Sequence, residues 1–311
     1  MSQTKFKPGD IINIIDFAKI YDHPNILIAA RFWEDERYNA AKICYKFMRS
    51  IDDMIDDYKA GNGSLTSAKK KLFTAKVNDW ISSLEKSSSD DPFIKEVIET
   101  VTNFKIPLKL FHNFAKSMIY DINNDGFVKY NDFLLYAEGA SVAPASLFVH
   151  LCCLKKENGE YISPSFDIIE VARPCALFSY LVHIIRDFQK DQLDNLNYFA
   201  IDILKKNKLI PSDLKRMANG EPVTGNFRNV IKEYYERAED YRLKTQEEIK
   251  KLTSSIETRY LLSLHIIYNL YLQVFERIDI SDGNFTTEEL NPSPLEIKNR
   301  VIEVIDNIKI H

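Results

Sequence analysis

Glycine is scarce in this sequence, with nine residues in a chain of 311. Sheet-rich and Rossmann-type proteins place glycine in turns and phosphate-binding loops, so its scarcity counts against both classes. The N-terminal segment MSQTKFKPGD has no apolar core and therefore lacks the form of a signal peptide. The most apolar late run, residues 260–275, is interrupted by His265, Asn269 and Gln273. That run is shorter than the roughly 20 apolar residues that a membrane span needs.

The chain also lacks an excess of positive charge and any closely spaced cysteine pair typical of a metal site. Its formal net charge is −4 and its pI is about 5.9, which gives no long-range attraction to nucleic acid. The four cysteines lie in apolar helical contexts where a reduced, buried thiol is expected: Cys44, Cys152, Cys153 and Cys175. We therefore expect a soluble protein of the reducing cytoplasm that does not bind nucleic acid. A peripheral contact with a membrane, for release of an apolar product, is compatible with these features.

Apolar residues recur at steps of three and four over most of the chain, which is the pattern of amphipathic helices. We predict helices at residues 10–20, 25–58, 65–86, 92–103, 107–120, 130–156, 166–191, 195–206, 227–251, 257–277 and 294–308. A polar linker is expected at residues 211–226 and a loop at 279–292. With 45% hydrophobic residues and no break in composition, the sequence predicts one all-α domain over residues 1–311, in which residues 1–20 form an N-terminal extension helix.

The helix predicted at residues 130–156 is rich in small side chains and contains Pro144. Small side chains let a neighbouring helix or a ligand approach closely, and an interior proline kinks a helix. Two interpretations follow: tight helix packing, or a kinked wall beside a long apolar cavity.

The helix predicted at residues 25–58 ends in an acidic motif, RSIDDMIDD at residues 49–57. Residues four apart share a helix face, so Asp52 pairs with Asp56, and Asp53 pairs with the aspartate that closes the motif. Carboxylates held this close repel each other, but Mg²⁺ takes such hard oxygen ligands and commonly bridges them to phosphate oxygens. The alternative is an acidic face in contact with water.

A second acidic pair, Asp187 and Asp191, follows an apolar run at residues 176–185 that predicts a buried helix. Two such pairs at the ends of core helices predict a metal–diphosphate site between them. This arrangement requires the helices at 25–58 and 166–191 to lie near the centre of the fold. We expect them to run antiparallel enough to bring the two acidic pairs face to face.

Residues 121–132, DINNDGFVKYND, match a calcium-binding EF-hand loop at positions 1, 3, 5 and 6, with Asp132 at position 12. Three observations weaken this match. The chain has no convincing partner loop, Asp is a poorer bidentate ligand than Glu at position 12, and any loop between helices favours Asn, Asp and Gly. Calcium binding is therefore the less favoured interpretation.

The order of these motifs resembles that of the squalene and phytoene synthase family, over residues 26–305. Residues 45–57, YKFMRSIDDMIDD, match the family pattern Y-x-F-x-R-x-x-D-D-I-x-D-D, and residues 185–191 match its second acidic motif. Residues 30–32 lie where the family has its S-R-x-L-P segment. Residues 107–121 resemble its P-L…G-M-x-x-D-L helix, and Tyr136 with the small residues after it resembles Y-C-x-x-V-A-G-x-V-G.

The resemblance implies an isoprenoid-synthase-type helical bundle with a central cavity. It also implies an enzyme that joins two isoprenoid diphosphates, farnesyl or geranylgeranyl diphosphate, head to head. The implied Mg²⁺ ligands are Asp52, Asp53, Asp56, Asp187 and Asp191, the implied catalytic residues are Tyr45, Arg49, Tyr136 and Arg186, and the implied contacts of the substrate are Arg31, Arg49, Arg186 and Lys190. NADPH would be needed only for a squalene product, and a phytoene product would place the chain in carotenoid biosynthesis.

The carbocation that forms when such a diphosphate leaves must be kept from water and faced by aromatic rings. The candidates for this aromatic wall are Phe32, Tyr45, Phe47, Tyr136 and Phe178. Taken singly, each ring is expected in the core rather than in the wall, except Tyr45 and Tyr136, which match motif positions of the family.

The sequence departs from the family pattern at the second acidic motif. Lys190 stands where an acid is usual, Tyr180 and His183 replace the preceding Q-x-x-N, and two motif glycines are lost. Lys190 is close enough in sequence to pair with Asp187 or Asp191, but its place on the helix favours an interaction with the diphosphate. These departures leave open a noncatalytic member of the family that binds isoprenoid diphosphates or a partner.

Overall fold

The structure is a computed structural model that describes residues 7–17 and 25–308. Its helices and strands are, in chain order, α1 Pro8–Ile12, α2 Asn25–Ala30, α3 Asp35–Asn62, α4 Ser67–Lys86, α5 Pro92–Asn103, α6 Leu108–Asn123, α7 Tyr130–Ala137, η2 Glu138–Val142, α8 Ala143–Cys153, β1 Lys155–Glu157, β2 Glu160–Ile162, α9 Ile168–Arg186, α10 Phe188–Leu193, α11 Ile201–Lys206, α12 Pro211–Ala218, α13 Gly225–Leu252, α14 Thr258–Phe275, α15 Thr287–Leu290 and α16 Pro294–Asn307. The predicted all-α fold is confirmed. Within the described ranges, the strands are limited to one antiparallel hairpin, which the sequence analysis did not predict.

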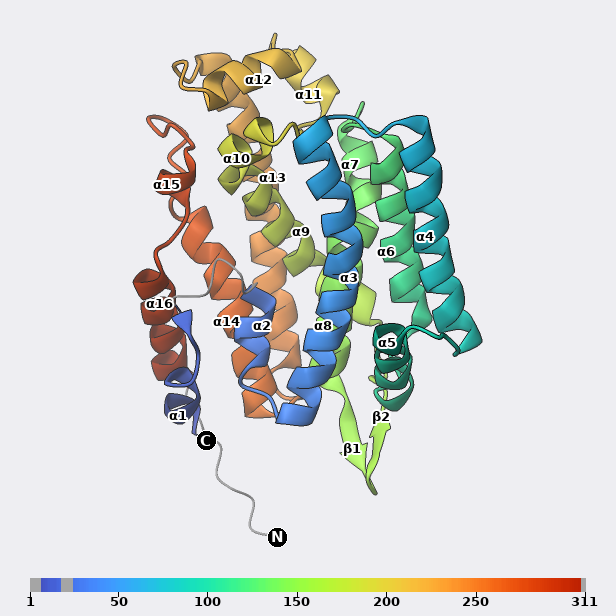
Figure 1. Cartoon of the computed structure of the whole chain (residues 1–311). Coiled ribbons are helices and arrows are strands. Elements are labelled where there is room, and N and C mark those ends of the chain that lie inside the picture. The colour runs from blue at the N-terminus through green and yellow to red at the C-terminus, as the bar shows by residue number, and fades with distance from the viewer. Residues whose placement is uncertain (1–6, 18–24, 309–311) are drawn as a thin grey trace.

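The long helices run along a common axis, with α11 and α12 across one end of the bundle and the β-hairpin at the other (Figure 1). Helix α9 lies in the middle of this arrangement, because it packs against α8, α13 and α14. Its apolar residues face inward on all sides, and the Asp167 carboxylate caps its first turn by accepting a hydrogen bond from the Ile169 amide at 2.9 Å. A helix that is apolar all round is stable only when it is surrounded by protein or lipid.

Two helical stretches, residues 130–153 and α9, are long and apolar enough to cross a membrane by length and composition alone. Each has 61% of its apolar window buried inside the protein. Core helices of a globular domain have the same property, so these stretches are explained by the packing of the bundle.

The helix predicted at residues 25–58 is broken at residues 31–34, which separate α2 from α3. The break places two large rings in the core: Phe32 is 0% exposed and Trp33 is 5% exposed. Glu34 then adopts an extended conformation before α3 and accepts a hydrogen bond from the Tyr260 hydroxyl at 2.7 Å. Burial of two aromatic rings outweighs the helical pattern here.

The helix predicted at residues 166–191 ends at Arg186, and a bend at Asp187 leads into α10. The bend buries Phe188 against Phe199 and Phe227. The predicted antiparallel arrangement of the two central helices is also wrong, because α3 and α9 run toward the same end of the bundle (Figure 1). Each acidic motif lies at the C-terminal end of its helix, so only a parallel arrangement brings the two motifs together.

The predicted helix at residues 130–156 consists of three pieces, and its irregularity precedes Pro144. The π-helical turn η2 forms at Glu138–Val142, and Pro144 lies at the start of α8. A π turn inserts one extra residue into a helix, and here it places Gly139 directly against Asn113 and Ser117 of α6. Close contact between helices therefore sets the irregularity, and α8 ends at Cys153, before the hairpin.

Three predicted segments differ near the ends of the bundle. Residues 195–200 are not helical, because Asn195 adopts a left-handed conformation with φ of 61°. The predicted polar linker contains α12, which the sequence analysis missed although Asp213 caps its first turn, and the predicted loop at 279–292 contains α15. The helix predicted at residues 10–20 is also shorter than expected, because α1 ends at Ile12 and residues 13–17 are not α-helical. Residues 18–20 lie outside the described part of the chain.

Candidate active site

The first acidic motif lies on the C-terminal half of α3. Arg49 holds two of its carboxylates, donating to Asp52 at 3.0 Å and to Asp53 at 2.6 Å. Asp56, one turn further on, has a buried Oδ1 atom without any hydrogen-bond partner. A buried carboxylate oxygen without a partner is costly, so this end of α3 is suited to receive a cation.

The second acidic motif spans the bend between α9 and α10. Arg186 binds Asp187 in a bidentate manner, with its Nε at 2.8 Å and its Nη2 at 2.6 Å from the two carboxylate oxygens. The side chain of Lys190 is exposed and makes no direct ion pair with Asp187 or Asp191, although its charge acts to lower the pKa of both carboxyl groups. The lysine is therefore available at the rim of the site.

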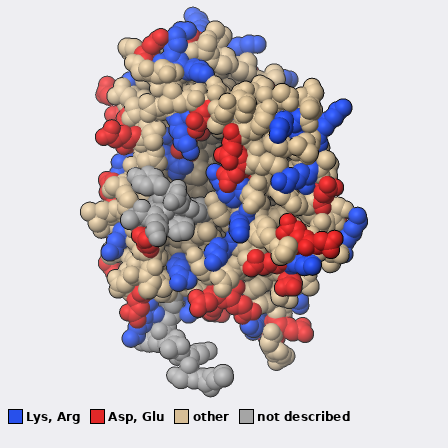
Figure 2. Space-filling model, viewed as in Figure 1, with Lys and Arg blue, Asp and Glu red and all other residues tan. Residues whose placement is uncertain are grey.

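The two motifs line one cleft of about 290 Å³, which we call the acidic cleft. Its walls include Arg49, Asp52, Asp53, Asp56, Asp57, Tyr136, Tyr180, His183, Asp187, Lys190, Asp191 and Tyr198. Figure 2 shows a hollow on this face of the molecule beside a row of acidic side chains that lies over α3. The prediction that the two motifs meet is thus confirmed by the structure.

Crowding and burial of like charges perturb the carboxyl groups of the acidic cleft. Burial, together with Asp52 and Asp121, raises the pKa of Asp56 to about 8. Burial and Asp187 raise the pKa of Asp191 to about 8. Burial also pushes the pKa of Asp187 upward, but the Arg186 guanidinium outweighs this effect, so that pKa lies below its ordinary value. The positive charges of Lys59 near Asp56 and Lys190 near Asp191 only partly offset this rise, and a divalent cation would offset it further.

An apolar cavity of about 320 Å³ adjoins the acidic cleft. Five residues line both: Arg49, Asp52, Ala140, Tyr180 and His183. From there the apolar cavity extends among α2, α3, α8, α9, α13 and α14, with walls that include Tyr45, Phe114, Phe148 and Tyr271. A polar, acidic entrance joined to an apolar interior suits a molecule with an anionic head and a hydrocarbon tail.

The residues present fit a divalent cation that is shared with a ligand. Within residues 7–17 and 25–308, no group of three or more His, Cys, Asp or Glu side chains is already arranged to hold a metal ion. Mg²⁺ usually keeps several waters and binds proteins through one or two carboxylates plus phosphate oxygens. The partnerless Oδ1 of Asp56 and the raised pKa of Asp191 identify these two carboxylates as the ones with unused capacity.

Several candidates from the sequence lie elsewhere. Arg31 pairs with Asp35 at 3.6 Å and covers the Tyr38 ring, and it lines neither the acidic cleft nor the apolar cavity. Arg186 stands behind Asp187 and lines neither hollow. Asp187, which Arg186 binds, lines the acidic cleft instead.

The predicted aromatic wall is only partly formed by the residues that the sequence suggested. Tyr45 lines the apolar cavity and Tyr136 lines the acidic cleft. The three phenylalanines belong to the core: Phe32 is fully buried, Phe47 packs on Phe111 and Phe178 packs on Phe275. Their burial agrees with the core position that was expected for each of them taken singly.

No site role was predicted from the sequence for Tyr198, His183 or Tyr271. Tyr198 lines the acidic cleft from the segment before α11. His183 and Tyr271 meet across α9 and α14, with ring centroids 4.9 Å apart. The departure from the family pattern was a signal for His183, whereas nothing in the local sequence distinguishes Tyr271 from other core aromatics.

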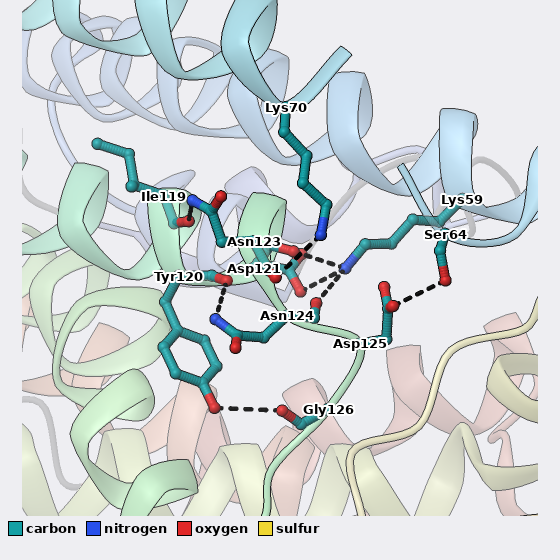
Figure 3. Close-up of polar contacts among 10 residues, drawn as sticks. All are labelled: Lys59, Ser64, Lys70, Ile119, Tyr120, Asp121, Asn123, Asn124, Asp125 and Gly126. Atoms are coloured by element: carbon teal, nitrogen blue, oxygen red, sulfur yellow. Dashed lines mark hydrogen bonds and ion pairs between the residues drawn. The ribbon is translucent and has the colours of Figure 1, made fainter. Parts of the chain in front are cut away.

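The calcium-like segment takes a different shape from an EF-hand loop (Figure 3). Helix α6 continues to Asn123, so the first three positions of the calcium-like segment are helical. The Lys59 ammonium donates to Asp121 Oδ1 at 2.8 Å, to the Asp121 carbonyl at 2.8 Å and to the Asn124 carbonyl at 3.1 Å. The Asp125 carboxylate accepts a hydrogen bond from Ser64. A lysine from α3 therefore takes the oxygens that a calcium ion would need.

Comparisons with known proteins agree with this geometry. A family model described as squalene/phytoene synthase matches residues 23–296. A chloroplastic phytoene synthase from an Oncidium hybrid cultivar is 22% identical over 255 residues, which cover 81% of this chain and 57% of the relative. A chloroplastic phytoene synthase from Narcissus pseudonarcissus is 21% identical over 252 residues, covering 81% of this chain and 56% of the relative. The chain thus spans little more than half the length of these curated relatives.

Solved structures share the fold. A dehydrosqualene synthase in complex with a ligand superposes with a TM-score of 0.67 at 14% identity, covering 97% of this chain and 100% of that chain. A squalene synthase from Alicyclobacillus acidocaldarius superposes with a TM-score of 0.62 at 13% identity, covering 84% and 89% of the two chains. The predicted isoprenoid-synthase-type helical fold is confirmed by these likenesses.

Proposed function

Since the chain belongs to the squalene/phytoene synthase family, we propose that it joins two prenyl diphosphates head to head, in a reaction of the phytoene or squalene synthase type. The observation that supports this most is the junction of the acidic cleft and the apolar cavity at five shared residues. A prenyl diphosphate has the matching division into a polyanionic head and an apolar tail. Farnesyl and geranylgeranyl diphosphate are the proposed substrates.

The residues of the acidic cleft would hold and ionise the diphosphate. Mg²⁺ bound there would stabilise the charge that develops on the leaving group. Asp52, Asp56 and Asp191 are the proposed ligands, with Asp53 and Asp187 next to them. Arg49 is half-exposed at the junction of the two hollows and already holds two carboxylates. On binding, its guanidinium is expected to turn from Asp53 toward a phosphate oxygen, which it contacts equally well.

The residues at the junction would protect the cation that remains when the diphosphate leaves. Tyr180 places an aromatic ring at this junction, while Tyr45 lines the adjoining apolar cavity and Tyr136 lines the acidic cleft. The face of an aromatic ring stabilises a nearby cation. The phenol of Tyr136 is buried and its pKa lies well above the ordinary value because of that burial. It therefore stays protonated and is suited to donate a hydrogen bond to the diphosphate rather than to act as an anionic base.

Incubation of the purified protein with farnesyl or geranylgeranyl diphosphate and Mg²⁺, with and without NADPH, tests this proposal. We expect a hydrocarbon or cyclopropyl diphosphate product of twice the substrate length, and no product when Asp52 is replaced by Asn. A product that forms only with NADPH would identify the squalene type. Absence of product from both substrates, with intact binding of the diphosphate, would support the alternative of a noncatalytic binding protein.

Lys190 is the residue that favours this alternative, because it replaces an acid of the family motif. Its exposed side chain lines the acidic cleft and pairs with no carboxylate, so we propose that it binds the diphosphate in a still active enzyme. The substitution Lys190→Glu is then expected to weaken diphosphate binding. Tighter dependence on Mg²⁺ with unimpaired substrate binding would show instead that the lysine displaces a metal ion.

The proposed product also bears on where the protein acts. A hydrocarbon of this size partitions into lipid, so we propose a cytoplasmic enzyme that contacts a membrane peripherally when it releases product. A phytoene product would assign the enzyme to carotenoid biosynthesis. Fractionation of cells with and without substrate, followed by detection of the protein in the membrane pellet, tests this placement.

A further inference from the structure

His183 shares a helix face with the second acidic motif. It precedes Asp187 by four residues, and Asp187 precedes Asp191 by four. The helical hydrogen bonds continue through the bend, from the Asp187 amide to the His183 carbonyl at 2.8 Å and from the Asp191 amide to the Asp187 carbonyl at 2.8 Å. One face therefore presents an imidazole and two carboxylates in succession, and all three side chains line the acidic cleft.

The imidazole of His183 has an unused nitrogen. Its Nε2 atom is buried and has no hydrogen-bond partner, although most buried polar atoms in proteins have one. The Tyr271 ring lies 4.9 Å away, centroid to centroid, and fixes one side of the imidazole. The residue lines both the acidic cleft and the apolar cavity, so the unused nitrogen belongs to a side chain at the junction of the two.

We propose that His183 supplies a nitrogen ligand to a divalent metal ion in the acidic cleft and thereby shifts its metal preference from Mg²⁺ toward Mn²⁺ and Co²⁺. The proposal rests on the metal-dependent function proposed above. Carboxylate and water oxygens suit Mg²⁺, whereas imidazole nitrogen suits transition metals, which bind nitrogen more tightly along the series from Mn²⁺ to Cu²⁺. An amide at this position, as in the family pattern, would offer only an oxygen.

The alternative role of Nε2 is a hydrogen bond to a phosphate oxygen or a water molecule. Two features favour the metal. Arg186 already binds the neighbouring Asp187 carboxylate, whereas Asp191 has no such partner and can offer its oxygens to a metal ion beside His183. In addition, Lys190 and Arg49 already line the cleft as donors for a phosphate, while the carboxylates there have no nitrogen ligand beside them other than His183.

Pulsed electron paramagnetic resonance of Mn²⁺ bound to the protein with inorganic diphosphate tests the proposal without any turnover. We expect the coupling of a directly coordinated imidazole nitrogen in the wild-type spectrum. Protein that carries ¹⁵N-labelled histidine should show the corresponding change of coupling, which requires no substitution. Absence of a histidine coupling from the wild-type spectrum would refute the proposal.

Substitution then assigns the coupling to one residue. His183→Asn should abolish it, whereas the control His265→Asn, on α14 and away from the lining of the acidic cleft, should leave it unchanged. Calorimetric titration should show a larger loss of affinity for Mn²⁺ than for Mg²⁺ in His183→Asn. The loss for Mn²⁺ should be on the order of tenfold or more, because removal of even an outer partner of a metal ligand costs about that much.

These outcomes separate the inference from the proposed function. Histidine coupling in a protein that forms no product would support the metal ligand and contradict the synthase activity. Product formation without histidine coupling would support the synthase activity and contradict the metal ligand. An unchanged Mn²⁺ to Mg²⁺ affinity ratio in a folded His183→Asn variant would also refute the role of His183.

Discussion

Some carboxyl groups of the acidic cleft have raised pKa values, because nearby positive charges only partly offset the effect of burial. Asp56 shows this most clearly, since burial raises its pKa from the ordinary 3.8 to about 8. A carboxyl whose pKa is raised on folding adds stability that is complete below its unfolded pKa and is lost as the pH rises through its folded pKa. The metal-free protein should therefore lose this contribution between about pH 4 and about pH 8.

Replacing Asp56 by Asn should remove this pH-dependent loss of stability, because an amide does not ionise. We expect the melting temperature of the wild type in EDTA to fall more steeply between acidic and mildly alkaline pH than that of Asp56→Asn. Turnover should be abolished in the variant, because a proposed metal ligand is gone. Thermal unfolding at several pH values, with Asp90→Asn as an exposed control, provides the measurement. Identical pH profiles for wild type and Asp56→Asn would contradict the assigned burial of charge.

Lys59 has the opposite role, because it neutralises a buried carboxylate. The side chains of Lys59 and Asp121 are 6% and 14% exposed and are 2.8 Å apart. Breaking such a pair leaves one uncompensated buried charge, so Lys59→Met should lower the free energy of unfolding by about 3–5 kcal/mol. The double variant with Asp121→Asn should recover part of this loss. Urea titration measures both.

Lys70→Met is the matched control for Lys59→Met. Lys70 also reaches the segment after α6, but it donates to the Asn123 carbonyl at 3.0 Å in an exposed position (Figure 3). Its loss should therefore change stability only slightly. Equal decreases in the free energy of unfolding for Lys59→Met and Lys70→Met would show that burial of the Lys59 ion pair adds nothing to its effect on stability.

At the scale of elements, the π turn η2 packs directly against α6, and its Ala140 lines both the acidic cleft and the apolar cavity. The Ser117 hydroxyl of α6 donates to the Tyr136 carbonyl at 2.7 Å, just before this turn. Gly139 within the turn has no space for a methyl group, because a Cβ atom there would meet the Asn113 carbonyl oxygen and the Ser117 hydroxyl. The close approach of α6 and η2 thus holds Tyr136 in the wall of the acidic cleft.

Gly139→Ala should disturb this contact. Overpacking of a close helix contact costs about 1–3 kcal/mol, and we expect the free energy of unfolding to fall by that amount. Gly61→Ala is the control, since nothing lies within 4 Å of a Cβ at that helical position and alanine favours a helix over glycine. Denaturant titration should show destabilisation by the first substitution and unchanged or increased stability with the second.

For the whole molecule, the ligand and the fold should stabilise each other, because the acidic cleft joins α3 to α9 and α10. Mg²⁺ relieves repulsion between the carboxylates, and diphosphate completes the coordination of the metal. We expect Mg²⁺ and inorganic diphosphate together to raise the melting temperature more than the sum of either alone. At a ligand concentration 100 times its Kd, the stabilisation is about 2.7 kcal/mol.

Differential scanning calorimetry measures this cooperation. The variant Asp191→Asn should show a smaller joint effect, because one of the two unpaired carboxylates is removed. A joint effect of full size in Asp191→Asn would place the metal elsewhere. This experiment does not depend on which prenyl chain the enzyme uses.

The sequence by itself determined the helical class, most helix positions and the two acidic motifs that line the acidic cleft. Acidic pairs at four-residue spacing share a helix face whatever surrounds them, so Asp52 with Asp56 and Asp187 with Asp191 were predictable. Contacts between residues distant in the chain were not. The break before α3 depends on burial of Phe32 and Trp33, and the parallel direction of α3 and α9 depends on how the helices connect around the core.

Tertiary structure alone also decided which polar groups have partners. Lys59 meets Asp121 across 62 positions of sequence and thereby closes a segment with the pattern of a calcium loop. His183 meets Tyr271 from another helix and keeps an unpaired nitrogen beside the acidic cleft. Local sequence sets helix faces through backbone geometry, whereas the pairing and burial of a side chain depend on packing between elements far apart in the chain.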